Sequence, residues 1–367
     1  MVQRIRGKGG GPRIYHLKQN NQLITDTKQI SDSLASKFAH NSSTDHYSPK
    51  FQRYKRQAER KPLRFRSDNN EEYNQKFSLF ELESALNRSP DTSPGPDEVH
   101  YQLLKHLPKA ALEKLLAIFN HIWITGDFPP SWRKATVIPI AKPGKDPFDP
   151  TNYRPIALTS CLCKTMERMI NVRLVWYLES NNLLTPAQSG FRKGRCTLDH
   201  LVRLETYIRE AFLRKKRLIA VFFDLEKAYD TTWKYGIMKD LYDMNIRGRM
   251  PLFIENFLKD RSFNVRLGSI ISDEFEQEMG VPQGSVLSVT LFSLKINSIV
   301  KCLNEDTSCS LYVDDFLICY EGKKMCELLK DNYNSVLTKS SNGQMRMASN
   351  SQKPRLSVCT SANQPDP

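Results

Sequence analysis

Apolar residues recur along much of the chain at intervals of three to four, the spacing of one buried helix face. Leu79, Leu82 and Leu86 follow Ser78, a residue suited to capping a helix that ends before Pro90. The same spacing predicts helices over residues 26–38, 112–125, 161–180 and 198–213. Two more helical stretches are predicted, one running to about residue 244 and one to about residue 303.

Shorter apolar runs bounded by turn residues predict strands. Residues 135–141 and 153–158 indicate a hairpin with basic residues at its tip, and 263–267 with 275–279 a second strand pair. An apolar strand at 218–223 ends on Asp224, and a hairpin at 310–320 surrounds Asp314 and Asp315. Helices and hairpins in this mixed order, without an internal repeat, predict an α+β fold rather than a doubly wound sheet.

The two ends of the chain differ in composition from the part between them. Residues 1–76 are polar and basic, so we expect a partly disordered N-terminal extension that includes the helix at 26–38. Beyond residue 330 the apolar pattern gives way to Ser, Asn, Gln and Lys, so 331–367 is expected to be a degenerate, disordered tail.

Basic residues outnumber acidic residues, 54 Lys and Arg against 40 Asp and Glu, which leaves a net charge of +14. A dispersed positive field suits a long polyanion, although a basic soluble protein without such a partner has the same composition. The eight cysteines include no Cys-x-x-Cys pair, so neither disulfides nor a zinc site is expected. Without a secretory signal or an apolar run of ~20 residues, we expect an intracellular protein, nuclear or cytoplasmic, that does not contact a membrane.

Three aspartates lie in apolar surroundings. Asp224 ends the strand at 218–223, where it needs solvent, a partner or a cation, unless it caps a following helix. Asp314 and Asp315 interrupt the apolar hairpin, where Asp suits a turn, but adjacent carboxylates repel each other unless cations lie nearby. Taken singly, each aspartate is explained about as well by a cap or a turn as by chemistry.

Taken together, the three carboxylates predict a site for phosphoryl transfer. Such chemistry uses two metal ions ~3.5–4 Å apart, bridged by carboxylates from neighbouring elements. Magnesium is the expected ion, because a few carboxylates, phosphate oxygens and water satisfy it.

Three blocks of sequence resemble motifs A, B and C of reverse transcriptases, in the same order and spacing. They are Val221-Phe-Phe-Asp-Leu-Glu-Lys-Ala-Tyr-Asp230, Gly280-Val-Pro-Gln-Gly-Ser-Val-Leu-Ser288 and Tyr312-Val-Asp-Asp315. The likeness continues upstream through Ser93-Pro-Gly-Pro-Asp97, Trp132-Arg-Lys134, Asn152-Tyr-Arg-Pro-Ile-Ala-Leu-Thr159 and Gln188-Ser-Gly-Phe-Arg192. From about residue 77 to 322 the chain resembles the polymerase domain of a Jockey-type non-LTR retrotransposon.

This resemblance implies a right-hand polymerase, with a fingers-like region at 77–214 and a palm of antiparallel sheet and helices at 215–330. It implies an RNA-directed DNA polymerase that transfers dNTPs to a primer 3′-hydroxyl, with an RNA template and a DNA primer as partners. Two Mg²⁺ ions are implied as cofactors, with Mn²⁺ as a substitute. No thumb can be assigned, so we expect it to be absent or truncated and the chain to be a retrotransposon fragment. The oligomeric state is not indicated.

The resemblance also assigns roles to residues. Asp224, Asp314 and Asp315 would be the catalytic carboxylates and metal ligands, and Tyr229 the steric gate beneath the sugar, with core packing as its alternative role. Four residues would contact the nucleotide: Gln283, Gly284, Lys142 and Arg154. A small residue at Gly284 lets the backbone approach closely, whereas a solvated charge is the alternative at the two basic positions. Arg192 and Lys193 would contact the template or its phosphates.

Two other functions fit parts of the pattern. A catalytically inactive remnant would bind nucleic acid with the same basic surface, but all three carboxylates are retained. An RNA-directed RNA polymerase would read the sugar with an acid such as Asp230, six residues after Asp224, whereas Tyr229 and the Tyr-Val-Asp-Asp block favour DNA synthesis. The chain also departs from many reverse transcriptases at Val289, where they have proline.

Overall fold

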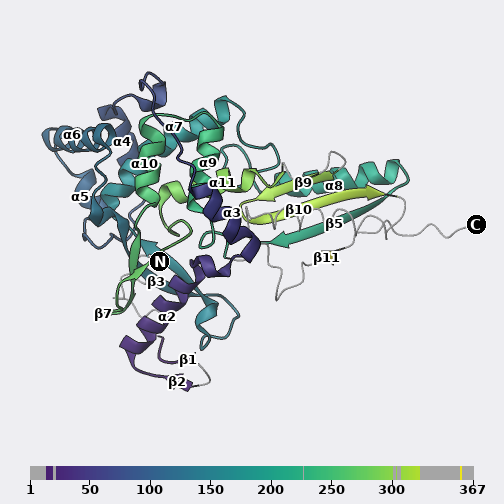
Figure 1. Ribbon diagram of the computed structural model, residues 1–367, viewed down its shortest axis with the longest axis horizontal. Coiled ribbons are helices and arrows are strands. Elements are labelled where there is room, and N and C mark those ends of the chain that lie inside the picture. Colours follow the sequence, from purple (N-terminus) through teal and green to yellow (C-terminus); the bar gives the residue numbers. More distant parts are fainter. Residues whose placement is uncertain are drawn as a thin grey trace, which may run out of the picture. The chain divides into compact units, whose positions relative to one another are not determined.

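Helices and mainly antiparallel sheets alternate along the chain in the computed structural model (Figure 1). The structure describes residues 14–19, 22–225, 227–300, 303, 307–322 and 356–357. The predicted mixture of helices with antiparallel strands is therefore confirmed. Most of the tail predicted to be disordered, 331–367, lies outside the described residues.

The chain forms two compact units, each built from three separate segments. Unit 1 comprises Met1–Thr44, Leu63–Ser180 and Met238–Ser288, and unit 2 comprises Asp45–Pro62, Asn181–Ile237 and Val289–Pro367. Each unit has a sheet and a buried apolar core of its own.

The sheet of unit 1 is built on the predicted hairpin. Strands β3 (Lys134–Ala141) and β4 (Tyr153–Leu158) pair in antiparallel register, and β6 (Ser262–Leu267) joins β3 in parallel. Two short strands, β7 (Ile270–Ile271) and β8 (Phe275–Glu276), pair with β6. The predicted strand pair thus exists, although its second strand is shorter than 275–279. A separate small hairpin joins β1 (Leu17–Gln19) and β2 (Gln22–Ile24).

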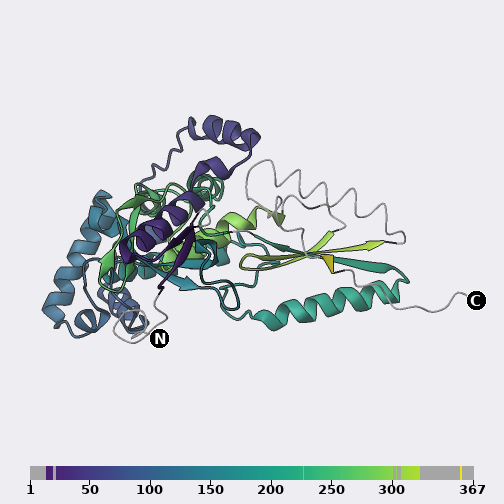
Figure 2. The same cartoon turned by 90° about the horizontal axis from the view of Figure 1, so that it is seen from below.

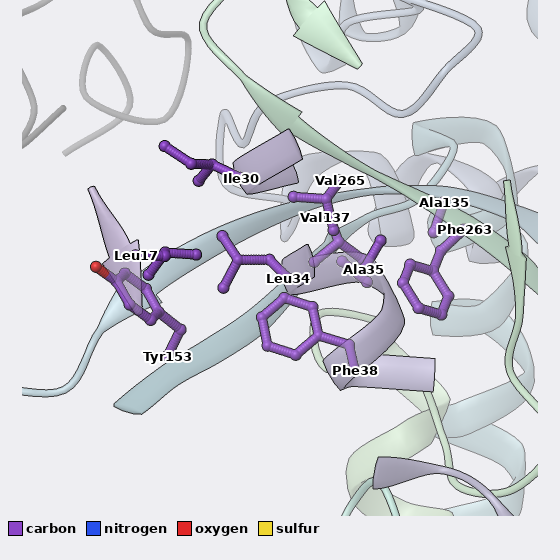
Figure 3. Close-up of a cluster of buried hydrophobic side chains, with 11 residues drawn as sticks. Leu17, Ile30, Leu34, Ala35, Phe38, Ala135, Val137, Tyr153, Phe263 and Val265 are labelled. Carbon is purple, nitrogen blue, oxygen red and sulfur yellow. The ribbon is translucent and has the colours of Figure 1, made fainter. Parts of the chain in front are cut away.

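Helix α2 (Thr27–Asn41) supplies much of the core of unit 1. Asp26 caps it by accepting a 2.9 Å hydrogen bond from the Gln29 amide. Leu34 and Phe38 lie among Val137 and Val265 of the sheet (Figure 3). The helix predicted at 26–38 is therefore confirmed, and its apolar face is buried in the core.

The remaining helices of unit 1 largely follow the predicted pattern. Ser78 and Glu81 form a capping box that starts α4 (Leu79–Asn87), and α6 (Lys109–Thr125) ends at Gly126, whose φ is +76°. Helix α7 covers Cys161–Ser180, as predicted. Helices α5 (Tyr101–Lys105) and α10 (Arg249–Leu258) were not predicted. Short 3₁₀ turns cover Thr44–His46, Glu72–Asn74, Pro130–Arg133 and Pro150–Asn152.

Four antiparallel strands form the sheet of unit 2, in the order β11 (Leu356–Ser357), β5 (Arg217–Asp224), β10 (Asp315–Gly322) and β9 (Thr307–Tyr312). Helix α8 (Thr197–Leu213) runs along one face of this sheet (Figure 2), where Leu218 and Leu317 pack with Ala211. On the opposite face, Phe223 and Phe316 pack against helix α11 (Val286–Asn297).

A further helix of unit 2, α3 (Pro49–Glu59), was not predicted. Phe51 packs edge-on against Trp233 with ring centroids 5.4 Å apart, and the Trp233 indole donates a 2.8 Å hydrogen bond to Glu59. The Tyr47 hydroxyl, just before the helix, donates to the Thr231 carbonyl. These contacts fasten α3 to the segment that follows β5.

Two predicted helices have different bounds in the structure. The stretch after Asp224 turns at residues 227–231, and helix α9 covers only Lys234–Asp243. Helix α11 ends at Asn297 rather than near residue 303. Within the part of the chain that the structure describes, every helix is too short or too polar to cross a bilayer.

Candidate active site

Strands β5 and β10 place two of the predicted carboxylate positions opposite each other. In the antiparallel ladder, residue 224 is the direct partner of residue 315. Directly opposed residues carry their Cβ atoms on one face of a sheet, ~4.5–5.5 Å apart. Strand β5 continues to Asp224, and the next helix begins only at Lys234, so the interpretation of Asp224 as a helix cap is wrong. The side chain of Asp224 lies outside the described residues.

The turn between β9 and β10 holds the third carboxylate. Tyr312 pairs with Asp315, which leaves Val313 and Asp314 as a two-residue loop. Val313 has a φ of +59°, whereas Asp314 is not among the residues with positive φ, the pattern of a type II′ turn. Asp314 is half-buried and Asp315 is exposed. The turn that was an alternative to catalysis is therefore real, and it presents both acids at the end of the sheet.

Tyr229 lies close enough to Asp314 to be affected by its charge. Burial, with a smaller contribution from the Asp314 carboxylate, raises the pKa of Tyr229 to about 12. The ring stacks on Phe292 of α11, with centroids 4.8 Å apart and planes inclined by 22°. Tyr229 is thus neutral at physiological pH, and one side of its ring is fixed by packing.

A buried glutamine contacts the same turn. Gln188 is 1% exposed, and its side-chain oxygen accepts hydrogen bonds from the Val313 amide at 3.1 Å and the Gly190 amide at 2.8 Å. Its side-chain nitrogen donates to the Val313 carbonyl at 3.4 Å. The sequence placed Gln188 in a family block without giving it a role. Its contacts with the backbone of Val313 could be found only in the structure.

The two residues predicted to contact the template differ in their surroundings. Arg192 is half-buried and donates to the Thr185 carbonyl at 2.8 Å and the Gln188 carbonyl at 3.2 Å. Lys193 is exposed. Arg192 therefore supports its own loop, and its predicted contact with a template stays a prediction, as does that of Lys193.

In unit 1, the loop predicted to contact the nucleotide rests on strand β4. The Ala157 amide donates a 2.7 Å hydrogen bond to the Gln283 carbonyl. Gly284 has a φ of +133°, and a Cβ atom there would lie 2.4 Å from the Ala157 carbonyl oxygen. Only glycine fits this position without moving the backbone.

Arg154, from the same strand, and Lys142, the first residue after β3, are the basic residues predicted for the hairpin. Arg154 is exposed and pairs with Ile140 across the ladder, three residues before Ala157. Lys142 is half-buried, and its ammonium group donates to the Thr151 carbonyl at 3.2 Å. Strand β4 therefore carries Arg154 and supports Gln283 and Gly284 within one unit.

Glu167 is a functional candidate that the sequence analysis missed. This fully buried residue of α7 accepts hydrogen bonds from the Val286 and Leu287 amides at 2.8 and 3.1 Å, and from the Ser285 hydroxyl. It therefore caps the first turn of α11, which begins two residues after Gly284. The sequence did contain an indication of this contact, because Glu167 is an acid on the apolar face of the helix predicted at 161–180.

The donor chemistry of the aspartates suits a hard cation. Carboxylate oxygens at opposed ladder positions and in the adjoining turn are the ligands that Mg²⁺ prefers. Among the described side chains, which do not include that of Asp224, no three His, Cys, Asp or Glu groups cluster in a way that could hold a metal ion.

A protein-family model matches much of the chain. The family described as reverse transcriptase (RNA-dependent DNA polymerase) matches residues 140–358, more than half of the chain. The match covers all ten predicted site residues.

Several curated proteins of Drosophila melanogaster are similar to the chain. A protein named "Probable RNA-directed DNA polymerase from transposon X-element" is 32% identical over 67% of this chain and 27% of its own length. Its counterpart from transposon BS is 35% identical over 63% of this chain and 26% of its own length. The RNA-directed DNA polymerase from mobile element jockey is 31% identical over 68% and 28%. The chain thus spans little more than a quarter of the length of these relatives.

Proposed function

The chain belongs to the reverse transcriptase (RNA-dependent DNA polymerase) family, and from this premise we propose that it copies an RNA template into DNA. The reaction extends the 3′-hydroxyl of a DNA primer with dNTPs and releases pyrophosphate. Retrotransposon polymerases are among its relatives, which supports the same role here.

One observation carries this proposal. Residues 224 and 315 are direct partners in the β5–β10 ladder. Asp314 lies in the adjoining turn, close enough for its charge to help raise the pKa of Tyr229. Three acid positions at one end of a sheet, beside an aromatic ring, suit transfer of a nucleotide.

Asp224, Asp314 and Asp315 would hold two Mg²⁺ ions, or Mn²⁺ in their place, which when bound activate the 3′-hydroxyl and neutralise charge on the phosphates. Tyr229 would exclude a 2′-hydroxyl, because Phe292 prevents its ring from moving away. Gln283, Gly284, Lys142 and Arg154 would bind the incoming nucleotide, with the two cations facing its triphosphate. Arg192 and Lys193 would contact the template.

These roles correspond to a right-hand polymerase, with residues 77–214 as a fingers-like region and 215–330 as the palm. The antiparallel sheet of unit 2 supports the assignment of a palm. RNA and dNTPs as substrates would place the activity inside the cell, in the nucleus or the cytoplasm.

Primer extension on an RNA template with Mg²⁺ tests the proposal. We expect the whole chain to extend the primer with dNTPs, and Asp224→Asn and Asp315→Asn to lower the rate at least ~10³-fold, because each removes a proposed metal ligand. Asp127→Asn changes an exposed aspartate and should leave the rate unchanged. Tyr229→Ala should admit ribonucleotides, whereas Tyr229→Phe should not.

Two results would count against the proposal. Equal background signal from the unmodified chain and both aspartate variants would contradict polymerase activity. A preference of the unmodified chain for ribonucleotides would instead indicate RNA synthesis.

A further inference from the structure

The turn that carries Asp314 has an unfavourable backbone. Val313 has a φ of +59°, a region that β-branched residues rarely enter. Glycine or asparagine is the usual residue at this position of a primed turn. The conformation of the turn must therefore be held by contacts outside it.

Gln188 makes contacts of this kind. Its amide oxygen accepts from the Val313 N–H, and its amide nitrogen donates to the Val313 carbonyl, so both backbone polar groups of the strained residue are bound. The same oxygen also accepts from the Gly190 N–H. Rotating the amide by 180° would turn its NH₂ group towards two N–H donors, so the orientation is determined by its partners.

The loop that carries Gln188 is itself held firmly. The Leu311 amide donates to the Ala187 carbonyl at 2.9 Å, and the Ser189 amide donates back to the Leu311 carbonyl at 3.0 Å. Three arginines donate to carbonyl groups of residues 185–188: Arg192, Arg195 and Arg203. A Cβ atom at Gly190 would lie 2.6 Å from the Val313 amide nitrogen, so loop and turn are in direct contact.

We propose that Gln188 is a positioning residue, which holds the Val313-Asp314 turn in the conformation from which Asp314 and Asp315 act. This inference rests on the proposed function, because it explains how that site is kept in order. Gln188 acts through Val313 and does not contact substrate. A displacement of ~1 Å at a reacting group costs on the order of 10²-fold in rate, so a relaxed turn should lower turnover.

Gln188→Leu tests this role, because leucine has a similar size but forms no hydrogen bond. We expect kcat for primer extension to fall ~10- to 100-fold, while KM for dNTP and the affinity for template-primer change less than ~3-fold. Gln52→Leu is the matched control, since Gln52 of the same unit donates to the Tyr47 carbonyl and not to the turn. It should leave kcat unchanged.

Val313→Gly supplies the decisive second variant. Glycine adopts positive φ without penalty, so the turn should no longer depend on Gln188. In the Val313→Gly background we expect Gln188→Leu to lower kcat less than ~3-fold, against ~10- to 100-fold in the unmodified chain. Independent, additive losses in the double variant would overturn the proposal.

Hydrogen exchange separates this inference from the proposed polymerase activity. In Gln188→Leu the Val313 amide should exchange faster by at least ~10-fold, while the Leu311 amide, which donates to Ala187, stays protected. Absence of RNA-templated synthesis by the unmodified chain would contradict the proposed function alone. Unchanged protection of Val313 in Gln188→Leu would contradict the role of Gln188, whether or not the chain is active.

Discussion

His200 contacts strand β9 of the hairpin that carries Asp314 and Asp315. Its Nδ1 atom lies within hydrogen-bond distance of the Ser310 hydroxyl, and its ring lies edge-on to Tyr312 at 5.3 Å. Burial lowers the pKa of His200, and the positive charges of Arg203 and Arg195 lower it further, against an opposing effect of Asp199.

Because folding lowers the pKa of His200, the stability of the folded chain should decrease as the pH falls. Below about pH 6.5, the ordinary pKa, the unfolded chain takes up a proton at residue 200 more readily than the folded chain. Stability contributed by neutral His200 is therefore complete above pH 6.5 and lost as the pH falls through the lowered pKa. We expect the melting temperature to fall less steeply between pH 6.5 and ~5 in His200→Gln than in the unmodified chain. His121→Gln, at an exposed position, should leave the slope unchanged.

The order of Asp224, Asp314 and Asp315 along the chain made them candidates for catalysis, but the sequence did not predict their local geometry. A strand end and a helix cap look alike in sequence until the next helix is located, here at Lys234. Positive φ at Val313 runs against residue preference, so no propensity argument could have predicted it. The contact of Gln188 with the turn could not be predicted either, since Val313 lies 125 residues away along the chain.

Among the elements, α11 depends on an acid from another helix for its first turn. Glu167 satisfies the Val286 and Leu287 amides and the Ser285 hydroxyl. Its charge also favours the protonated form of Arg261, a fully buried residue whose pKa is lowered by burial. A neutral side chain at position 167 would weaken both interactions.

We therefore expect Glu167→Gln to lower the free energy of unfolding by about 1–3 kcal/mol. Chemical denaturation of the two proteins measures this difference directly. Glu113→Gln, on the exposed face of α6, is the matched control and should stay within about 0.5 kcal/mol of the unmodified chain. A loss equal to that of the control would show that Glu167 does not cap α11.

Helix α3 has two opposite faces with different chemistry. Phe51 and Trp233 anchor one face, whereas Arg53, Arg56 and Arg60 project from the other and are exposed. Within the described residues these three arginines form no ion pair, so their charge is available to a polyanion.

Replacing Arg53, Arg56 and Arg60 with glutamine should weaken binding of a template-primer duplex. Up to three phosphate contacts would be lost, which reduces the slope of log affinity against log salt by up to ~3. Titrations at several salt concentrations measure this slope.

A second triple variant removes the same charge from residues that are already paired. Arg209, Arg214 and Lys216 of unit 2 form ion pairs with Glu205, Glu210 and Glu321. Their replacement with glutamine should change the salt slope by less than 1. Equal effects of the two triple variants would indicate a general effect of net charge rather than binding by α3.

Most regular elements could be predicted, because their apolar residues follow a clear period. Helix α7 and the β3–β4 hairpin are examples. Helix α3 escaped prediction because its buried face contains little besides Phe51 in a polar sequence. Pro251 interrupts the start of α10, whose apolar positions therefore did not look helical.

At the scale of the whole molecule, each unit is assembled from three separate segments of the chain. A fragment of residues 77–214 would lack strand β6, although Ala135 and Val137 of β3 pair with Phe263 and Val265 there. The fragment would also lack α2, whose Leu34 and Phe38 share a buried cluster with Ala135 and Val137, so the core face of β3 would be exposed to water.

We expect the 77–214 fragment to show no cooperative thermal unfolding, whereas a fragment of residues 1–322, which retains both β3 and β6, should unfold cooperatively. Circular dichroism and the dispersion of amide signals in NMR spectra measure the difference. A well-dispersed spectrum from the 77–214 fragment would contradict this expectation.

The pairing of β3 with β6 also has a consequence for synthesis on the ribosome. Lys134 can pair with Ser262 only after the ribosome has added 128 more residues. This synthesis takes roughly 6–26 s at ~5–20 residues per second. During that interval the nascent β3–β4 hairpin has an open edge of unpaired backbone groups. Pro139 lies two residues beyond the stretch of β3 that pairs with β6, and it has no N–H group that could bond to another strand. The edge that can bind chaperones or pair wrongly is therefore confined to the first residues of β3.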